Sequence, residues 1–317
     1  MIAALVLSAL VAAAASPAPR PGEPIEVDVR ENALVGEFAA PSDSARHPAV
    51  IILGGLQGGI PTEASSFAHQ GYAAFAVAYF GADPLPKTVD RIPLERVSRA
   101  LDYLAARPEV DPARIGILGL SKGTELALLA AAREPRIKSV AVISPSAYVW
   151  FAPAFDAEPD RSSWTLNNGA LPFIAPDRGA EAALAETYRS GGTYAFRDLY
   201  DASLAAASAA TVASATIPVE RIGGPLLCIA GADDREWDSA GACKTIAARR
   251  SAAHRDAGDQ VAIEPGAGHA LSLGGRPAPD VIPFGRMKMR LGGSVDANAR
   301  GGADAWNRTL TFFARTL

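Results

Sequence analysis

One stretch of the sequence, residues 114–133, limits the possible folds more than any other. Residues 114–118 (RIGIL) predict a buried strand, and residues 122–133 predict a helix. Between them lies Gly119-Leu120-Ser121-Lys122-Gly123. A strand that turns sharply into a helix at G-x-S-x-G is the setting of a nucleophile elbow, in which glycines make room for a strained turn and the serine hydroxyl stands above the strand ends. We therefore predict that Ser121 is a nucleophile, with a Gly–Ser turn that merely connects the two elements as the simpler alternative.

Short apolar strands alternate with helices along the rest of the chain. Strands are predicted at residues 25–30, 33–39, 49–53, 72–79, 138–143, 225–230 and 260–264, and helices at 62–70, 93–106, 240–255 and 306–315. This alternation predicts an α/β fold with a doubly wound, mostly parallel sheet. Residues 147–219 break the rhythm, since a crossover between parallel strands needs only about a dozen residues. We interpret this stretch as an inserted lid or cap.

The N-terminal residues are expected to lie outside the folded domain. Residues 1–15 are apolar and uncharged, and a Pro-rich stretch follows at residues 17–24. An apolar run too short for a membrane span and followed by small residues is typical of a secretory signal peptide. We expect a signal peptide over residues 1–16, a linker over 17–24 and one catalytic domain over 25–317. The protein would then be exported, periplasmic or secreted, with no stable membrane span after cleavage. The alternatives are an uncleaved anchor and a mis-set start codon. If the apolar run is not a signal, we expect a cytoplasmic protein.

Composition excludes several other classes of protein. Hydrophobic residues make up 49% of the chain and the net charge is −4, which excludes a disordered chain. The charge balance, without a long basic run, indicates no nucleic-acid partner. The two cysteines, Cys228 and Cys243, could form a disulfide in an exported protein or remain two buried thiols.

A serine nucleophile needs a histidine base, and the sequence contains four histidines. His47 precedes the first buried strand, and His69 and His254 lie in helical stretches. His269 lies in the Gly-rich loop that follows the predicted strand 260–264. Because it comes late in the chain and at a strand end, His269 is the predicted base.

The acid that orients the base should follow the preceding strand. Asp233, Asp234 and Asp238 all lie in the loop after residues 225–230. The residues alone do not separate Asp233 from Asp234; we favour Asp234, and Asp238 is the weakest candidate because it lies at helix-cap distance.

The oxyanion hole needs two backbone N–H donors. One is expected from Lys122, directly after the nucleophile, and the other from the glycine-rich loop after the strand 49–53. Leu56 is the expected donor in that loop, and Gln57 is the next candidate. The loop matches neither phosphate-binding glycine pattern, and we expect no cofactor and no metal.

The inserted stretch is rich in aromatic residues at its start, and we expect it to bind the acyl group of a substrate. The residues expected to contact that group are Trp150, Trp164 and Phe173.

Several segments together resemble one known family. They are LGGLQGG (53–59), GLSKGTELAL (119–128), GADDREWDS (231–239) and PGAGHAL (265–271), with RSSWT (161–165), LPF (171–173) and LGGSVDANARGGADAWNRTLTFF (291–313) similar to bacterial members. The family is the α/β-hydrolase catalytic domain shared by type-I acyl-CoA thioesterases and bile acid-CoA:amino acid N-acyltransferases. The resemblance implies an α/β-hydrolase fold and a triad of Ser121, Asp234 and His269, and so selects Asp234 over Asp233.

The resemblance also implies a serine hydrolase that cleaves esters or thioesters through an acyl-enzyme, most similar to an acyl-CoA thioesterase. In this family a serine nucleophile goes with hydrolysis, and a cysteine with transfer to an amine. The substrate would be a small-molecule acyl ester or thioester. The alternatives are a carboxylesterase or dienelactone-hydrolase-like enzyme, a serine peptidase, an acyltransferase with an amine or alcohol acceptor, and a non-catalytic exported binding protein.

Overall fold

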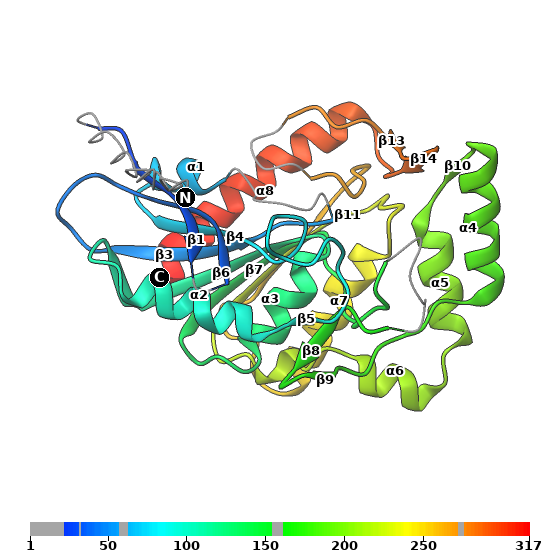
Figure 1. Cartoon of the computed structure of the whole chain (residues 1–317), viewed down its shortest axis with the longest axis horizontal. Coiled ribbons are helices and arrows are strands. Elements are labelled where there is room, and N and C mark those ends of the chain that lie inside the picture. The colour runs from blue at the N-terminus through cyan, green and yellow to red at the C-terminus, as the bar shows by residue number, and fades with distance from the viewer. Residues whose placement is uncertain (1–21, 32, 57–62, 154–160, 272–275) are drawn as a thin grey trace, which may run out of the picture.

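Figure 1 shows the computed structural model of the chain, which describes residues 22–31, 33–56, 63–153, 161–271 and 276–317. Its centre is an eight-stranded sheet with the order β1-β2-β4-β3-β6-β7-β11-β12. The strands are β1 (Ile25–Glu31), β2 (Leu34–Ala40), β3 (His47–Leu53), β4 (Ala73–Ala78), β6 (Val110–Leu120), β7 (Ile137–Ile143), β11 (Leu226–Gly231) and β12 (Gln260–Glu264). β1, β2 and β4 pair antiparallel, and the neighbours from β4 to β12 pair parallel. The predicted mostly parallel sheet is confirmed.

Helices cover both faces of this sheet, and strand β3 shows why. Ile51 and Leu53 belong to one apolar core, and Val50 and Ile52 belong to another on the opposite face. Successive side chains of a strand point to opposite faces, so a strand buried on both faces is apolar throughout. The first core includes side chains of α2 (Glu95–Ala105), α3 (Gly123–Ala131) and α7 (Ser239–Ala252). The second core includes side chains of α1 (Ala64–Ala68) and α8 (Val295–Thr316).

Helix α8 is longer than the helix predicted at residues 306–315. It begins at Val295, and the side chain of Ser294 caps it by accepting a hydrogen bond from the Ala297 N–H. Its first half contains Gly301, where a Cβ atom would lie 2.8 Å from Leu271 Cδ2. Glycine therefore allows close packing here. Because glycine adds nothing to the apolar periodicity, the first half of the helix was not predicted from the sequence.

Residues 144–225, between β7 and β11, form a separate layer beside the sheet, and we call this stretch the insertion. It contains the helices α4 (Arg178–Ser190), α5 (Phe196–Ala206) and α6 (Ala209–Ala215), the 3-10 turn η1 (Val219–Arg221), and the strands β8 (Trp164–Leu166), β9 (Gly169–Ala170) and β10 (Thr193–Tyr194). β8 and β9 form a small sheet with β5 (Ile92–Pro93). A third apolar core, which includes Trp150, Phe151 and Tyr200, holds this layer together.

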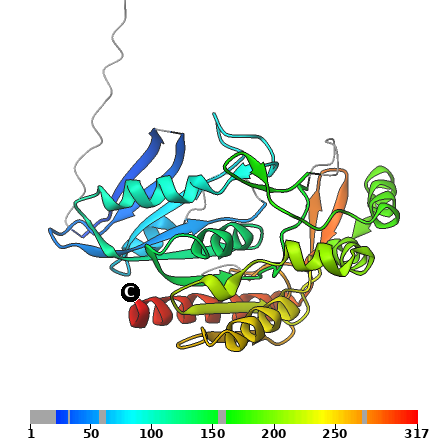
Figure 2. The ribbon, with the colours of Figure 1, turned by 90° about the horizontal axis from the view of Figure 1, so that it is seen from below.

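A hairpin from late in the chain extends the inserted layer. Strands β13 (Val281–Phe284) and β14 (Met287–Arg290) pair with each other, and β14 pairs with β10. In Figures 1 and 2 the insertion helices and this hairpin lie together at the end of the molecule opposite the β1–β2 hairpin. The sequence analysis did not predict β13 and β14.

Residues 1–21, which include the predicted signal peptide and most of the predicted linker, lie outside the described residues. Within the part of the chain that the structure describes, no helix combines the length and the apolar character needed to cross a membrane.

Candidate active site

The turn between β6 and α3 holds Ser121 in a strained conformation. Its φ angle is 51°, in the left-handed region that a non-glycine residue rarely adopts. A Cβ atom on Gly119 would lie 2.7 Å from Thr124 Cα, and one on Gly123 would collide with the carbonyl oxygens of Leu53 and Gly54. Glycine is therefore required on both sides of the serine, as the G-x-S-x-G pattern predicted.

Ser121 is the first member of a chain of hydrogen bonds. Its Oγ lies 2.7 Å from Nε2 of His269, and Nδ1 of His269 lies 2.9 Å from Oδ2 of Asp234. The three residues come from the ends of β6, β11 and β12, which lie at the same edge of the sheet. The structure thus brings together the three residues that the sequence and the family resemblance selected.

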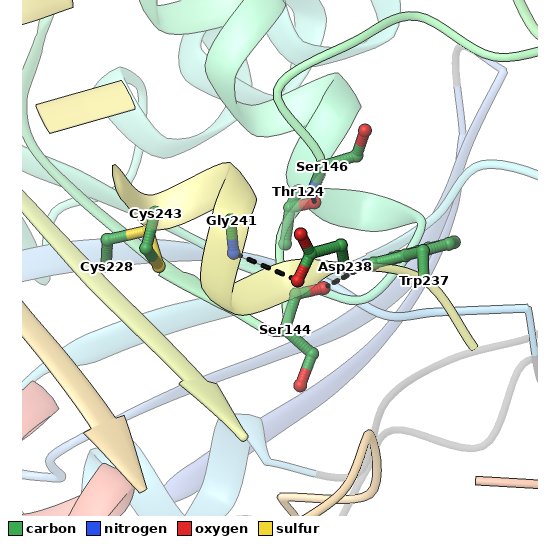
Figure 3. The surroundings of a disulfide bond; sticks show 8 residues. All are labelled: Thr124, Ser144, Ser146, Cys228, Trp237, Asp238, Gly241 and Cys243. Carbon is green, nitrogen blue, oxygen red and sulfur yellow. Dashed lines mark hydrogen bonds between the residues drawn. A yellow bond between two sulfur atoms is a disulfide. The ribbon is translucent and has the colours of Figure 1, made fainter. Parts of the chain in front are cut away.

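The three candidate aspartates have different surroundings. Asp234 is 1% exposed, and its Oδ1 accepts hydrogen bonds from the N–H groups of Glu236 (2.8 Å) and Trp237 (3.3 Å). Asp233 instead contacts Arg235 at 2.7 Å. Asp238 caps helix α7 by accepting from the N–H of the residue three positions later (Figure 3). Of the three, Asp234 is the one in contact with His269.

Hydrogen bonds to its backbone fix the loop that carries His269. The His269 N–H donates to the Leu291 carbonyl at 2.8 Å, and the His269 carbonyl accepts from Ser144 Oγ at 2.8 Å. The Gly268 N–H donates to Oδ1 of Asn298 on α8 at 2.7 Å. The sequence analysis gave Asn298 no role, because nothing in its local pattern shows which distant loop it would contact.

An aromatic ring packs against the imidazole. The rings of Trp237 and His269 lie edge to face with centroids 5.0 Å apart. Trp237 Nε1 donates to the Ser144 carbonyl at 3.1 Å, as Figure 3 shows. Trp237 therefore packs against the imidazole, and Ser144 holds both the indole of Trp237 and the backbone of His269.

The surroundings of His269 favour its protonated form. Burial alone would lower its pKa, but the charge and hydrogen bond of Asp234, together with the charge of Glu236, outweigh that effect and raise the pKa above the usual 6.5. A higher pKa makes the neutral imidazole a better proton acceptor for a serine hydroxyl.

A buried ion pair lies directly behind the elbow. Lys122 Nζ donates to Glu125 Oε1 at 2.7 Å, and both side chains are fully buried. Glu125 Oε2 accepts from Trp164 Nε1 at 2.8 Å and from the Trp150 N–H at 3.2 Å. The pair therefore connects the elbow helix to the insertion. The sequence analysis missed this role, since a Lys and a Glu three residues apart on a helix are usually a solvated surface pair.

The three predicted substrate contacts differ in how accessible they are. Trp164 is fully buried, whereas Trp150 lines a cavity of about 140 Å³ together with Tyr148, Tyr200 and Trp237. Phe173 is half-buried and packs at the boundary of the first and third cores. A substrate-binding role for Trp150, Trp164 and Phe173 stays a prediction.

The predicted oxyanion donors lie on two adjoining segments. Lys122 directly follows Ser121, and Leu56 is a half-buried turn residue after β3. Tyr79 Oη donates to the Gly54 carbonyl at 2.8 Å and so ties the start of that turn to β4. Gln57 lies outside the described residues. Among the residues described, no group of three or more His, Cys, Asp or Glu side chains could hold a metal ion.

A disulfide joins the two elements that flank the loop at residues 232–238, which contains Asp234 and is called the acid loop below. Cys228 of β11 and Cys243 of α7 are bonded to each other (Figure 3), and both are fully buried. Of the two alternatives for these cysteines, the structure contains the disulfide. The ring that it closes includes Asp234, Glu236 and Trp237.

Comparison with known sequences gives one family match and a set of relatives. The profile of the family "BAAT / Acyl-CoA thioester hydrolase C terminal" matches residues 92–317. The mitochondrial acyl-coenzyme A thioesterase 2 of Mus musculus is 30% identical over 92% of this chain and 60% of its own length. Acyl-coenzyme A thioesterase 5 of Mus musculus is 29% identical over 92% of this chain. The chain spans 65% of the length of that second relative.

Comparison with solved structures shows the fold. A dienelactone hydrolase-like promiscuous phosphotriesterase from metagenomic libraries has a TM-score of 0.53 and 18% identity, over 94% of this chain and 99% of its own. An acylaminoacyl peptidase from Pyrococcus horikoshii has a TM-score of 0.56 and 14% identity, over 94% of this chain and 42% of its own. With the mostly parallel sheet and its flanking helices, these likenesses confirm the α/β-hydrolase fold.

Proposed function

The chain belongs to the BAAT / acyl-CoA thioester hydrolase C-terminal family, and on this basis we propose that it is a serine hydrolase that cleaves acyl thioesters, including acyl-CoA. The observation that carries the proposal is the hydrogen-bonded chain from Ser121 through His269 to Asp234, which starts at a strained turn. A hydroxyl bonded to an imidazole that a buried carboxylate orients is the arrangement used for nucleophilic acyl transfer.

In the first step the acyl group moves to the protein. Ser121 Oγ gives its proton to Nε2 of His269 and attacks the thioester carbonyl carbon, while Asp234 holds the imidazole through Nδ1. The N–H groups of Lys122 and Leu56 are the proposed donors to the oxyanion. The C–S bond then breaks, and the thiol leaves with the proton from Nε2. The product of this step is an ester on Ser121.

In the second step water releases the acyl group. His269 accepts a proton from a water molecule, whose oxygen attacks the ester carbonyl. When the intermediate collapses, the proton on Nε2 returns to Ser121 Oγ and the carboxylic acid leaves. The charge of Asp234 stabilises the imidazolium that forms in both steps.

Labelling with a fluorophosphonate probe tests the role of Ser121. The wild-type protein should be labelled and should release thiol from an acyl-CoA, whereas Ser121→Ala should do neither. Ser66→Ala is the matched control, because it is the same substitution at an exposed residue of α1, away from the site. Labelling of Ser121→Ala equal to that of the wild type would contradict the proposal.

The leaving group and the acceptor are tested with the same acyl chain. The rates for a thioester and for the corresponding oxygen ester separate a thioesterase from a carboxylesterase. Addition of glycine or an alcohol should leave the free carboxylic acid as the product. An amide or ester product would instead assign acyl transfer.

We propose in addition that the protein is exported. The apolar run over residues 1–15 and the disulfide between Cys228 and Cys243 support this, because disulfides persist in oxidising compartments. Cell fractionation, with and without residues 1–16, tests the proposal. Equal retention of both forms in the cytoplasm would overturn it.

A further inference from the structure

Glu236 carries a buried carboxyl group that the proposed mechanism does not use. The residue is 3% exposed, and its Oε2 has no hydrogen-bond partner among the described residues. Its backbone N–H donates to Asp234, so the side chain starts from a fixed position in the acid loop. A buried polar group without a partner is costly, and its presence in a folded protein needs an explanation.

The charge of the Glu236 carboxyl interacts with three parts of the site. The charges of His269 and Lys122 favour its ionised form, and the charge of Asp234 opposes it. Glu236 in turn acts on Tyr200 of α5, whose pKa is raised by burial and then by this charge. The carboxyl therefore acts electrostatically on the base, on Lys122 of the elbow and on Tyr200 of the insertion.

The neighbouring charged groups already have partners. Lys122 is paired with Glu125, and Asp234 is paired with His269. Glu236 is thus left without a counterpart in a site whose other buried charges are satisfied. A group on a bound substrate can supply the missing hydrogen bond.

Burial raises the pKa of Glu236 to about 7, with the charge of His269 as the largest opposing effect. Near neutral pH the side chain can therefore be a carboxylate, which accepts a hydrogen bond, or a carboxylic acid, which can also donate one. A hydroxyl group suits both forms, and an ammonium group suits the carboxylate.

The acyl side of the substrate is the part that would reach this carboxyl. Trp237, the next residue, has its ring 5.0 Å from that of His269 and 5.4 Å from that of Tyr200. Tyr200 and Trp237 also line the aromatic cavity that contains Trp150. An acyl chain that extends from Ser121 past His269 toward this cavity would run along Trp237, the neighbour of Glu236 in the chain.

We propose that Glu236 is a specificity-determining residue that binds a hydrogen-bond donor, a hydroxyl or an ammonium group, carried by the acyl chain close to the reacting carbonyl. The inference rests on the proposed hydrolysis at Ser121. It narrows the substrate from acyl thioesters in general to acyl thioesters with a polar substituent near the carbonyl.

Three acyl-CoA thioesters with the same carbon chain test the inference, namely butanoyl, 3-hydroxybutanoyl and 3-aminobutanoyl. The readout is the ratio of kcat/KM for each substituted thioester to that for butanoyl, because an overall loss of activity cancels in a ratio. Wild type should prefer at least one substituted chain by about tenfold or more, the effect of one hydrogen bond to a charged group. The substituent that is preferred identifies the donor as a hydroxyl or an ammonium group.

Two variants and one control complete the experiment. Glu236→Leu should bring the ratio to about one or below, because the leucine cannot accept a hydrogen bond. Glu236→Gln has nearly the same shape as the wild type and serves as the second variant if Glu236→Leu does not fold. Glu236→Gln should lose the preference for the ammonium-bearing chain more strongly than the preference for the hydroxyl-bearing chain. Glu186→Leu is the matched control, because Glu186 is exposed on α4 and its loss should leave the ratio unchanged.

The inference and the proposed function fail in different ways. A wild-type ratio of about one with efficient butanoyl hydrolysis overturns the inference alone. A ratio that stays the same in both Glu236 variants also overturns it. No thiol release from these three thioesters or from longer acyl-CoA thioesters overturns the proposed function and the inference together.

Discussion

At the scale of single residues, His269 has two acidic neighbours. Asp234 bonds to Nδ1, and the charge of Glu236 adds to its effect, so the pKa of His269 is raised although the ring is buried. The pKa of Glu236 is itself raised to about 7. Because the two groups interact, proton binding at this site belongs to the pair rather than to either residue alone.

The pH dependence of hydrolysis should report this pair. The reaction needs a neutral imidazole, so kcat/KM should fall as the pH drops through a midpoint above 6.5. Glu236→Gln removes one of the charges that raise the pKa of His269, and the midpoint should move to lower pH. Profiles of kcat/KM for both proteins check this. A midpoint that moves upward in the variant would contradict the electrostatic account.

Asp234 and Asp233 offer a comparison between adjacent residues. Asp234→Asn should reduce kcat by about 10⁴-fold, because an amide no longer holds the imidazole in the required tautomer. Asp233→Asn should have a much smaller effect, since the Asp233 side chain is 45% exposed and contacts Arg235 rather than His269. Steady-state kinetics of the two variants measure the loss of kcat. Equal losses of kcat would contradict the proposed role of Asp234.

At the scale of elements, helix α8 holds in place the loop after β12 that carries His269, called the histidine loop below. Asn298 accepts from the Gly268 N–H and donates to the carbonyls of Ala278 (2.9 Å) and Gly292 (3.2 Å). One side chain thus joins the loop after β12, the segment before β13 and the turn before α8. The position of His269 depends on a helix that lies far from it in the sequence.

Substitution of Asn298 should affect both stability and activity. Asn298→Ala leaves the Gly268 N–H without its partner, so the free energy of unfolding should fall by about 1–3 kcal/mol. Activity should fall as well, because the loop that carries His269 loosens. Asn307→Ala on the exposed side of α8 is the control and should change neither. Urea unfolding and thiol release measure the two effects. Identical results for both variants would contradict the role of Asn298 in holding the loop that carries His269.

The difference between what could and could not be predicted also lies at this scale. Ser121 and His269 could be found because each lies in a glycine-rich turn after an apolar strand, where residue type and geometry are linked. Asp234 needed the family resemblance, since two adjacent acids look the same in a sequence. The hairpin β13–β14 was missed because its strands are short and because β14 pairs with β10, a distant segment.

Buried polar groups of the site were missed for a related reason. Glu125 and Lys122 have the spacing of a surface pair on a helix, and only the packing of the insertion above them makes them a buried one. The same holds for Glu236, which lies among charged residues in the sequence and is nevertheless enclosed. Burial is a property of tertiary structure, and periodicity does not reveal it in a loop or in a helix that is apolar on all sides.

At the scale of the whole molecule, polar contacts and apolar packing at the site both join the insertion to the layer of the sheet. Glu125 on α3 bonds to Trp164 and to the backbone of Trp150 in the insertion. Trp237 of the acid loop belongs to the third apolar core with Tyr200 of α5. We therefore expect the two layers to unfold together.

Glu125→Gln tests this connection. The variant leaves the Lys122 ammonium buried without its partner, which should lower the free energy of unfolding by about 3–5 kcal/mol. Glu186→Gln breaks an exposed pair with Arg189 and should change it by at most about 1 kcal/mol. Denaturant unfolding followed by fluorescence and by activity measures both variants. Two separate transitions in wild type, or a small effect of Glu125→Gln, would contradict the expected coupling.

The contact between α8 and the histidine loop also sets an order of events during synthesis. A ribosome makes Ser121 well before His269, and it makes Asn298 and the sheet-packing residues Phe312 and Phe313 after both. Domains generally fold as units, and we expect the loop that carries His269 to stay unfixed until α8 has been made. We therefore expect a nascent chain that contains Ser121 and His269 but not yet α8 to lack the proposed hydrolase activity.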